Sequence, residues 1–241
     1  MRFLGVLLAV LALAGCVSRT GGPVAESSSP ATETETSTSG TDETVVDDDG
    51  CEFVGKPDED APVGLPPTEP LGGDRVLLST SSGEIGLQLT PDETPCTVRS
   101  FLHLVSEGFF DGTECHRLTA SAGLKVLQCG DPSGDGTGGP GYTIPDELPT
   151  DLADAPTGQG TKVYPRGVLA MANAGPETGG SQFFMVYGDS TLPPDYTVFG
   201  GVDGTGLATL DAIAARGLTP TLGPEDGTPT TPVEIESAAT A

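Results

Sequence analysis

The sequence predicts a mostly β protein whose antiparallel strands close into a barrel, with two α-helices packed against it. Three observations support this expectation. Short apolar stretches, several with alternating polar residues, recur after residue 72. Glycine-rich turns separate them, and the chain contains 35 glycines. Only two segments, 95–108 and 209–217, are predicted to be helical. Many short strands with glycine turns and few helices favour a sheet that closes on itself.

The first predicted elements are a β-hairpin and a helix. In the stretch 75–89, apolar residues alternate with polar ones on both sides of a glycine turn, which is the period of a half-buried strand. Thr94 and Pro95 have the residue types of a helix cap and a first helical position. Apolar residues then follow at helical spacing as far as Gly108. His103 lies off this stripe, so we expect it to be solvated.

Further short strands are expected along the rest of the domain. Two strands and their connection fall within 113–131, and a long glycine loop follows. The other predicted strands lie within 162–174, 181–188, 196–202 and 232–237. Gly217 is expected to close the second helix.

The N-terminal part of the chain is predicted to lie outside this domain. Residues 1–15 combine one cation, Arg2, with an apolar run, which is the pattern of a signal peptide. The Leu-Ala-Gly-Cys sequence that ends at Cys16 resembles a bacterial lipobox, which implies cleavage before Cys16 and a diacylglycerol on its sulfur. A plain secretory signal is the alternative. Residues 16–50 are rich in Ser, Thr and acids, so we expect a disordered tether.

The remaining boundaries follow from changes in composition. Residues 51–71 are rich in proline and are expected to form an extended segment. Residues 72–236 have the sustained apolar content of a single domain, and 237–241 form a short tail.

The charge balance excludes some partners. The formal net charge is −25, from 35 acidic and 10 basic residues. Nucleic acid and anionic lipid surfaces would repel such a chain, so we expect no nucleic-acid partner. A surface charged for solubility outside the cell is the simpler interpretation.

The cysteines indicate an oxidising environment. If Cys16 carries a lipid, four remain: Cys51, Cys96, Cys115 and Cys129. An even number in an exported chain suggests two disulfides, with three possible pairings that the sequence does not distinguish. A zinc site is the alternative, but no Cys-x-x-Cys or Cys/His pair has ligand spacing, so we expect no metal.

Three motifs carry a family resemblance. Cys-His-Arg at 115–117 precedes Gln-Cys-Gly-Asp at 128–131, MANAGPETGGSQFF occupies 171–184, and YTVFGGV occupies 196–202. In this order they resemble the cyclophilins, the peptidyl-prolyl isomerases, over residues 75–236. The resemblance implies a closed eight-stranded antiparallel barrel capped by two helices. It also implies an isomerase without a cofactor, expected to be monomeric, that acts on proline-containing segments of exported proteins.

The resemblance also implies the site. Arg117 would place a cation near the prolyl nitrogen, and Gln128 and Asn173 would complete the catalytic set. The residues implied to contact the substrate are His116, Leu124, Val126, Ala172, Ala174, Gln182, Phe184, Leu192 and Tyr196. By strand alternation Phe184 should face the pocket and Phe183 the core. His116 is expected to orient its strand through ring hydrogen bonds.

The chain departs from the family pattern in one region. The segment between Arg117 and Gln128 is longer than in the family, and it places Lys125 where an apolar residue is usual. Because an ammonium group in an apolar pocket is costly, we expect Leu124 and Val126 to line the pocket and Lys125 to point outward.

These observations favour a lipid-anchored, extracytoplasmic isomerase. A cyclophilin-like module that binds peptides as a chaperone, with weak or no catalysis, is the alternative. A secreted hydrolase has little support, because the chain has no Gly-x-Ser-x-Gly motif.

Overall fold

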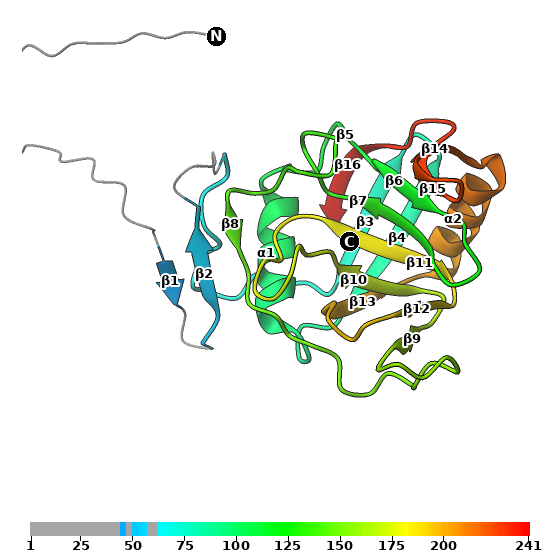
Figure 1. Cartoon of the computed structure of the whole chain (residues 1–241). Coiled ribbons are helices and arrows are strands. Elements are labelled where there is room, and N and C mark those ends of the chain that lie inside the picture. The colour runs from blue at the N-terminus through cyan, green and yellow to red at the C-terminus, as the bar shows by residue number, and fades with distance from the viewer. Residues whose placement is uncertain (1–43, 47–49, 57–61) are drawn as a thin grey trace, which may run out of the picture. The chain divides into compact units, whose positions relative to one another are not determined.

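The computed structural model describes residues 44–46, 50–56 and 62–241 (Figure 1). The predicted signal peptide at 1–15, the predicted lipidation site Cys16 and most of the predicted tether at 16–50 lie outside the described residues. None of the helices formed by the described residues has the length and apolar character needed to cross a membrane.

The described residues form two helices, α1, Pro95–Ser106, and α2, Gly204–Arg216. Thr94 and Pro95 occupy the cap and the start of α1, as predicted. Helix α2 begins earlier than the predicted 209, because the Asp203 carboxylate accepts a hydrogen bond of 2.7 Å from the Gly206 backbone N–H and so caps the helix.

Every pairing between strands in the described part of the chain is antiparallel. The strands of the main sheet are β3 (Arg75–Thr80), β4 (Gly83–Leu89), β5 (Thr113–Glu114), β6 (Arg117–Thr119), β7 (Lys125–Cys129), β10 (Val168–Met171), β11 (Phe183–Gly188), β13 (Val198–Val202), β14 (Leu218–Gly223), β15 (Asp226–Pro229) and β16 (Glu234–Thr240). Smaller sheets contain β1 (Thr44–Val46), β2 (Glu52–Gly55) and β8 (Tyr142–Thr143), and β9 (Lys162–Tyr164) with β12 (Ser190–Leu192).

The main sheet is a curled ladder of 11 strands in the order β14-β15-β6-β7-β11-β10-β13-β4-β3-β16-β5 (Figure 1). The predicted closed barrel of eight strands is therefore wrong, both in strand number and in closure. The strand predicted after residue 113 is interrupted at Cys115 and His116, so that β5 pairs with β16 while β6 pairs with β7. The β14–β15 hairpin then adds to the free edge of β6.

Strands β7, β10 and β11 are apolar on both faces. One face supplies Leu127, Leu169, Phe183 and Met185 to the interior core, where α1 packs with Phe101. Phe183 therefore faces the core, as alternation predicted. On the opposite face Val126, Ala170, Phe184 and Val186 pack with Tyr164 of β9, and we call these five residues the outer cluster.

The proline-rich segment contributes to the folded domain. Strand β2 pairs with β8, and Cys51 is bonded to Cys96 at the start of α1. His103 is buried, and its Nε2 lies 3.1 Å from the Val63 carbonyl oxygen. The prediction of a solvated His103 is therefore wrong, because the segment that contains Val63 covers this side of α1.

The predicted tether and the predicted C-terminal tail both contain residues that pair in a sheet. Strand β1 lies inside the predicted tether and pairs with β2, because Thr44 and the two valines after it have high strand propensity and find an ordered partner. Strand β16 continues to Thr240, which is opposite Val76 of β3. The residues predicted as a tail from 237 therefore complete the sheet instead.

Two disulfides connect the four described cysteines, Cys51 to Cys96 and Cys115 to Cys129. The first joins residues 45 positions apart and the second only 14. A longer loop removes more conformational freedom from the unfolded chain, so the Cys51–Cys96 bond should contribute more to stability.

Replacing Cys51 and Cys96 together by alanine should lower the free energy of unfolding by about 2–4 kcal/mol, because the unfolded chain regains the entropy of an open loop. Urea unfolding of both proteins without reductant measures this difference. The matched control replaces Cys115 and Cys129 by alanine and should lose less. An unchanged midpoint in the Cys51/Cys96 variant would contradict the prediction.

Candidate active site

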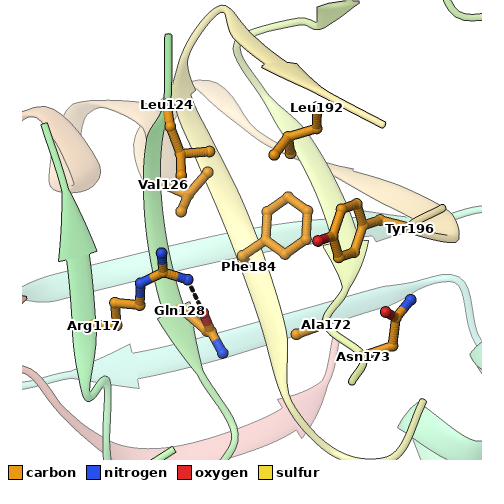
Figure 2. Close-up of a pocket in the computed structure, with 9 residues that line it drawn as sticks. All are labelled: Arg117, Leu124, Val126, Gln128, Ala172, Asn173, Phe184, Leu192 and Tyr196. Carbon is orange, nitrogen blue, oxygen red and sulfur yellow. Dashed lines mark hydrogen bonds between the residues drawn. The ribbon is translucent and has the colours of Figure 1, made fainter. Parts of the chain in front are cut away.

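A cavity of about 160 Å³ opens on the outer cluster (Figure 2). Its lining residues are Arg117, Leu124, Val126, Gln128, Ala172, Asn173, Phe184, Leu192 and Tyr196. All nine come from the residues that the sequence predicted for the site. They converge because Leu124, Val126 and Gln128 alternate along one face of β7 and its entry, and β7 pairs with β6 and β11. Lys125, between two of them, is not part of the lining.

Aromatic rings form one wall of the cavity. The rings of Phe184 and Tyr196 meet edge to face, with centroids 5.6 Å apart at 84° (Figure 2). Tyr164 packs beside both rings, and its hydroxyl lies 3.2 Å from the Tyr196 carbonyl oxygen, to which it donates. Burial raises the pKa of Tyr164 to about 12, so this hydroxyl remains a donor. Tyr164 thereby fixes the loop that carries Tyr196.

A series of polar side chains borders the opposite wall. Arg117 donates from Nε and Nη2 to the two carboxylate oxygens of Asp226, at 2.8 and 2.7 Å, and from Nη1 to Oε1 of Gln128 at 3.2 Å. Gln128 donates from Nε2 to Oε1 of Gln182 at 2.9 Å. Gln182 in turn donates to the carbonyl oxygens of Gly136 and Gly138. We call Asp226, Arg117, Gln128 and Gln182 the polar chain.

Arg117 stays positively charged at the edge of this apolar cavity. Its hydrogen bonds to Asp226 raise the pKa of the guanidinium above its ordinary value, although burial acts in the opposite direction. The side chain is 31% exposed, so it lies neither in bulk solvent nor in the core. The cavity therefore presents a fixed cation beside an apolar surface.

His116 does not make the ring hydrogen bonds that the sequence predicted. Both ring nitrogens are buried, and neither has a hydrogen-bond partner among the described residues. Burial lowers the pKa of His116, with Asp131 acting to raise it and Arg117 to lower it further. The imidazole is therefore neutral at pH 7. The glycine loop passes close to the ring, since a Cβ on Gly136 would lie 3.7 Å from Cδ2 of His116, but it supplies no hydrogen-bond partner to either nitrogen.

The glycine loop is held by a buried carboxylate. Asp131 accepts hydrogen bonds from the Ser133 backbone N–H and hydroxyl and from the Gly136 N–H. Burial tends to raise the pKa of Asp131, but these hydrogen bonds outweigh it and leave the pKa below its ordinary value. Gly130 precedes this carboxylate with φ of +87°, and a Cβ there would lie 2.3 Å from the Ser181 carbonyl oxygen. Only glycine fits this position.

Three predicted residues lie outside the cavity. Gln182 and Ala174 line a neighbouring cavity of about 460 Å³, and His116 lines neither. Gln128, Ala172 and Asn173 border both cavities. An extended peptide could therefore place consecutive residues in the two cavities.

Asn173 joins two loops at the rim. Its Nδ2 donates to the Asp195 carbonyl oxygen at 2.7 Å, and its Oδ1 accepts from the Gly175 N–H. Because the side chain is occupied, the backbone of Asn173 is the part that a bound peptide would meet.

Two residues of the site were missed by the sequence prediction. Tyr164 lies in a segment that was predicted only as a strand. Asp226 lies in the β14–β15 hairpin, and no sequence motif links it to Arg117, 109 positions earlier. Among the described residues, no group of three His, Cys, Asp or Glu side chains could hold a metal ion.

Comparisons with known proteins agree with this geometry. Residues 75–240 match the family described as cyclophilin type peptidyl-prolyl cis-trans isomerase/CLD. The chain is 54% identical over 194 residues to the probable peptidyl-prolyl cis-trans isomerase B of Mycobacterium tuberculosis H37Rv, covering 78% of this chain and 62% of that protein. It is 39% identical over 177 residues to peptidyl-prolyl cis-trans isomerase B of Streptomyces anulatus, covering 66% of this chain and 92% of that protein. The chain thus spans less than two thirds of the length of its mycobacterial relatives.

A solved structure shows the same fold. The crystal structure of a cyclophilin type peptidyl-prolyl cis-trans isomerase from Cryptosporidium parvum matches with a TM-score of 0.56 at 27% identity, covering 70% of this chain and 98% of that one. The same protein was also crystallised in the presence of the dipeptide Ala-Pro, again with a TM-score of 0.56.

The lowered pKa of His116 should make the domain less stable in mild acid. In the unfolded chain His116 has the ordinary histidine pKa of about 6.5, so as the pH falls it takes up a proton before the folded chain does. The contribution of neutral His116 to the free energy of unfolding is therefore fully present above about pH 6.5. It is lost as the pH falls toward the lowered pKa of the folded state. Urea unfolding at pH 7.5 and 5.5 should show a larger loss for wild type than for His116→Gln. Parallel losses in the two proteins would contradict the prediction.

Proposed function

We propose that this chain, which belongs to the cyclophilin-type peptidyl-prolyl cis-trans isomerase family, catalyses the rotation of X–Pro peptide bonds. The proposed substrate is an extended proline-containing segment of another protein, bound by a monomer without a cofactor. Family membership and the names of the relatives support the activity. The fixed guanidinium of Arg117 beside a small apolar cavity is the observation that carries the proposal.

The reaction explains why such a site is sufficient. Rotation about an X–Pro amide faces a barrier of about 18–20 kcal/mol because the amide is stabilised by resonance. No covalent bond breaks, so neither a nucleophile nor a general base is needed. A hydrogen bond to the prolyl nitrogen favours its pyramidal, twisted form, in which resonance is lost. A donor placed there stabilises the transition state more than the ground state.

Each wall of the cavity has a role in this proposal. Phe184, Leu192 and Val126 hold the proline ring by apolar contact. Arg117 donates to the prolyl nitrogen from the polar wall, with Gln128 beside it. The Asn173 backbone holds the residue that precedes proline. The ring is therefore gripped on one side of the rotating bond and the backbone on the other.

A peptide-binding module with little catalysis is the second candidate. The altered segment before Gln128, with Lys125 in place of an apolar residue, is the observation that favours it. In that case the domain would hold proline-containing segments as a chaperone.

The substitution Arg117→Ala should lower kcat/KM by about 10²–10³-fold, as expected for the loss of one transition-state donor. Affinity for a proline-containing peptide should persist, because the apolar wall is unchanged. A protease-coupled proline isomerisation assay and peptide calorimetry measure the two quantities. Arg166→Ala is the matched control, because Arg166 forms a similar ion pair with Asp211 and should keep full activity. Peptide binding without turnover in the wild type would favour the binding module.

We further propose that the enzyme acts outside the cytoplasm, on exported proteins, and is anchored by a lipid on Cys16. Three features support this location: the signal-peptide pattern of residues 1–15, the net charge of −25, and two disulfides, which persist in oxidising compartments. A flexible chain between the anchor and the domain would let the site reach clients near the membrane.

The substitution Cys16→Ala should release the protein from the membrane fraction, because the thiol that accepts the lipid is lost. Immunoblots of fractionated cells show the distribution, and intact mass of the wild type should show a chain that starts at Cys16 with added diacylglycerol. The variant lacking Cys115 and Cys129 is the control and should stay in the membrane fraction. An unmodified, soluble wild type would refute the anchor.

A further inference from the structure

Arg117 is clamped by a carboxylate that lies outside the cavity. Both oxygens of Asp226 accept hydrogen bonds from Arg117, at 2.8 Å from Nε and 2.7 Å from Nη2. This two-point contact fixes the plane of the guanidinium as well as its position. Asp226 is 27% exposed at its side chain and does not line the cavity.

The β14–β15 hairpin places this carboxylate beside Arg117. Asp226 is opposite Thr119 of β6, and the Ala120 N–H donates to the Glu225 carbonyl oxygen at 2.9 Å. Gly227 follows, where a Cβ would lie 2.0 Å from the Thr219 carbonyl oxygen. Only glycine therefore allows the two strands of the hairpin to approach so closely beside Asp226.

The clamp leaves part of the guanidinium available. Arginine has five N–H donors, and Asp226 and Gln128 use three of them. The two that remain are one on Nη1 and one on Nη2, at the end of the side chain that Figure 2 shows on the cavity wall with Gln128. Asp226 and Gln128 thus fix the direction in which Arg117 can donate.

We propose that Asp226 is a positioning residue of the isomerase reaction, which orients the Arg117 guanidinium toward the prolyl nitrogen; this inference rests on the proposed function. A long arginine side chain has many rotamers, and the two-point contact with Asp226 holds Arg117 in one of them. The carboxylate selects that rotamer before substrate arrives. The raised pKa of Arg117 is consistent with the strength of this contact.

A carboxylate also opposes the cation electrostatically, so two effects compete. Neutralising Asp226 would free more positive charge for the developing transition state but would also release the side chain. A misplacement on the order of 1 Å can cost about 10²-fold in rate, whereas the charge of a partly exposed pair is screened by solvent. Orientation therefore dominates, and loss of Asp226 should slow the reaction.

The first test is kinetic and uses the full-length chain. Asp226→Asn keeps the shape of the side chain but replaces one acceptor with a donor that faces the guanidinium. It should lower kcat about 10- to 100-fold with little change in KM, because the apolar wall still binds proline. Asp211→Asn is the matched control: the two oxygens of Asp211 accept from Nη1 and Nη2 of Arg166, at 2.8 Å each, and neither residue lines the cavity. It should leave both constants unchanged.

The second test asks whether Asp226 acts through Arg117. Lysine has no planar fork, so the carboxylate cannot orient it in the same way. In the Arg117→Lys background, Asp226→Asn should therefore cause a much smaller loss of kcat than in wild type. Equal losses in the two backgrounds would mean a general structural role and would overturn the inference. So would an unchanged or higher kcat in Asp226→Asn alone.

A third measurement separates this inference from the proposed function. In ¹⁵N NMR spectra the Arg117 Nε–H should give a resolved, slowly exchanging signal in wild type and in Asp211→Asn, and should lose it in Asp226→Asn. Absence of turnover in wild type would refute the proposed function alone, and the Nε–H signal would still decide whether Asp226 holds Arg117. A signal that is the same in wild type and Asp226→Asn would overturn the inference.

Discussion

The three strands β7, β10 and β11 pack apolar side chains on both of their faces, and the site depends on this constraint. Their inward side chains complete the interior core, and their outward side chains form the outer cluster. An apolar surface on the outside of a sheet requires cover. Tyr164, Tyr196 and Leu192 cover most of it from loops and from β9 and β12. The cavity beside Phe184 is the part that these residues leave open, so the core and the cavity are built on the same three strands.

The polar chain places hydrogen-bonding groups along one side of this open apolar surface. Apolar contact alone would not distinguish one apolar group from another. Asp226, Arg117, Gln128 and Gln182 connect the hairpin, two sheet strands and the glycine loop through successive hydrogen bonds. Each hydrogen bond restricts the side chain that makes the next one, so the loss of one would loosen its neighbours. The net charge of −25 plays little part here, because the charge that matters to Arg117 is the one carboxylate in contact with it.

The part of the site that the sequence predicted is the part built from local periodicity. Strand alternation assigned Phe183 to the core, which the structure confirms, and the cost of an ammonium group in an apolar pocket assigned Leu124 and Val126 to the lining and Lys125 to the outside. These relations span a few residues and depend on the pleat of a strand and the polarity of its side chains. The family motifs supplied the rest of the lining residues. The catalytic roles of Arg117, Gln128 and Asn173 stay predictions.

What the sequence did not predict depends on contacts between distant segments. His103 is polar and lies off the apolar stripe of α1, yet residues near Val63 cover it, and no periodicity within the helix records that cover. The same reason hides Asp226: a carboxylate in a hairpin turn has the composition of an ordinary solvated loop. Its partner becomes evident only when β15 pairs with β6. Local patterns determine which face a side chain takes, whereas the pairing of edge strands determines which charges meet. In this chain a sequence motif was enough to predict Arg117, whereas Asp226 could be found only from the pairing of the strands.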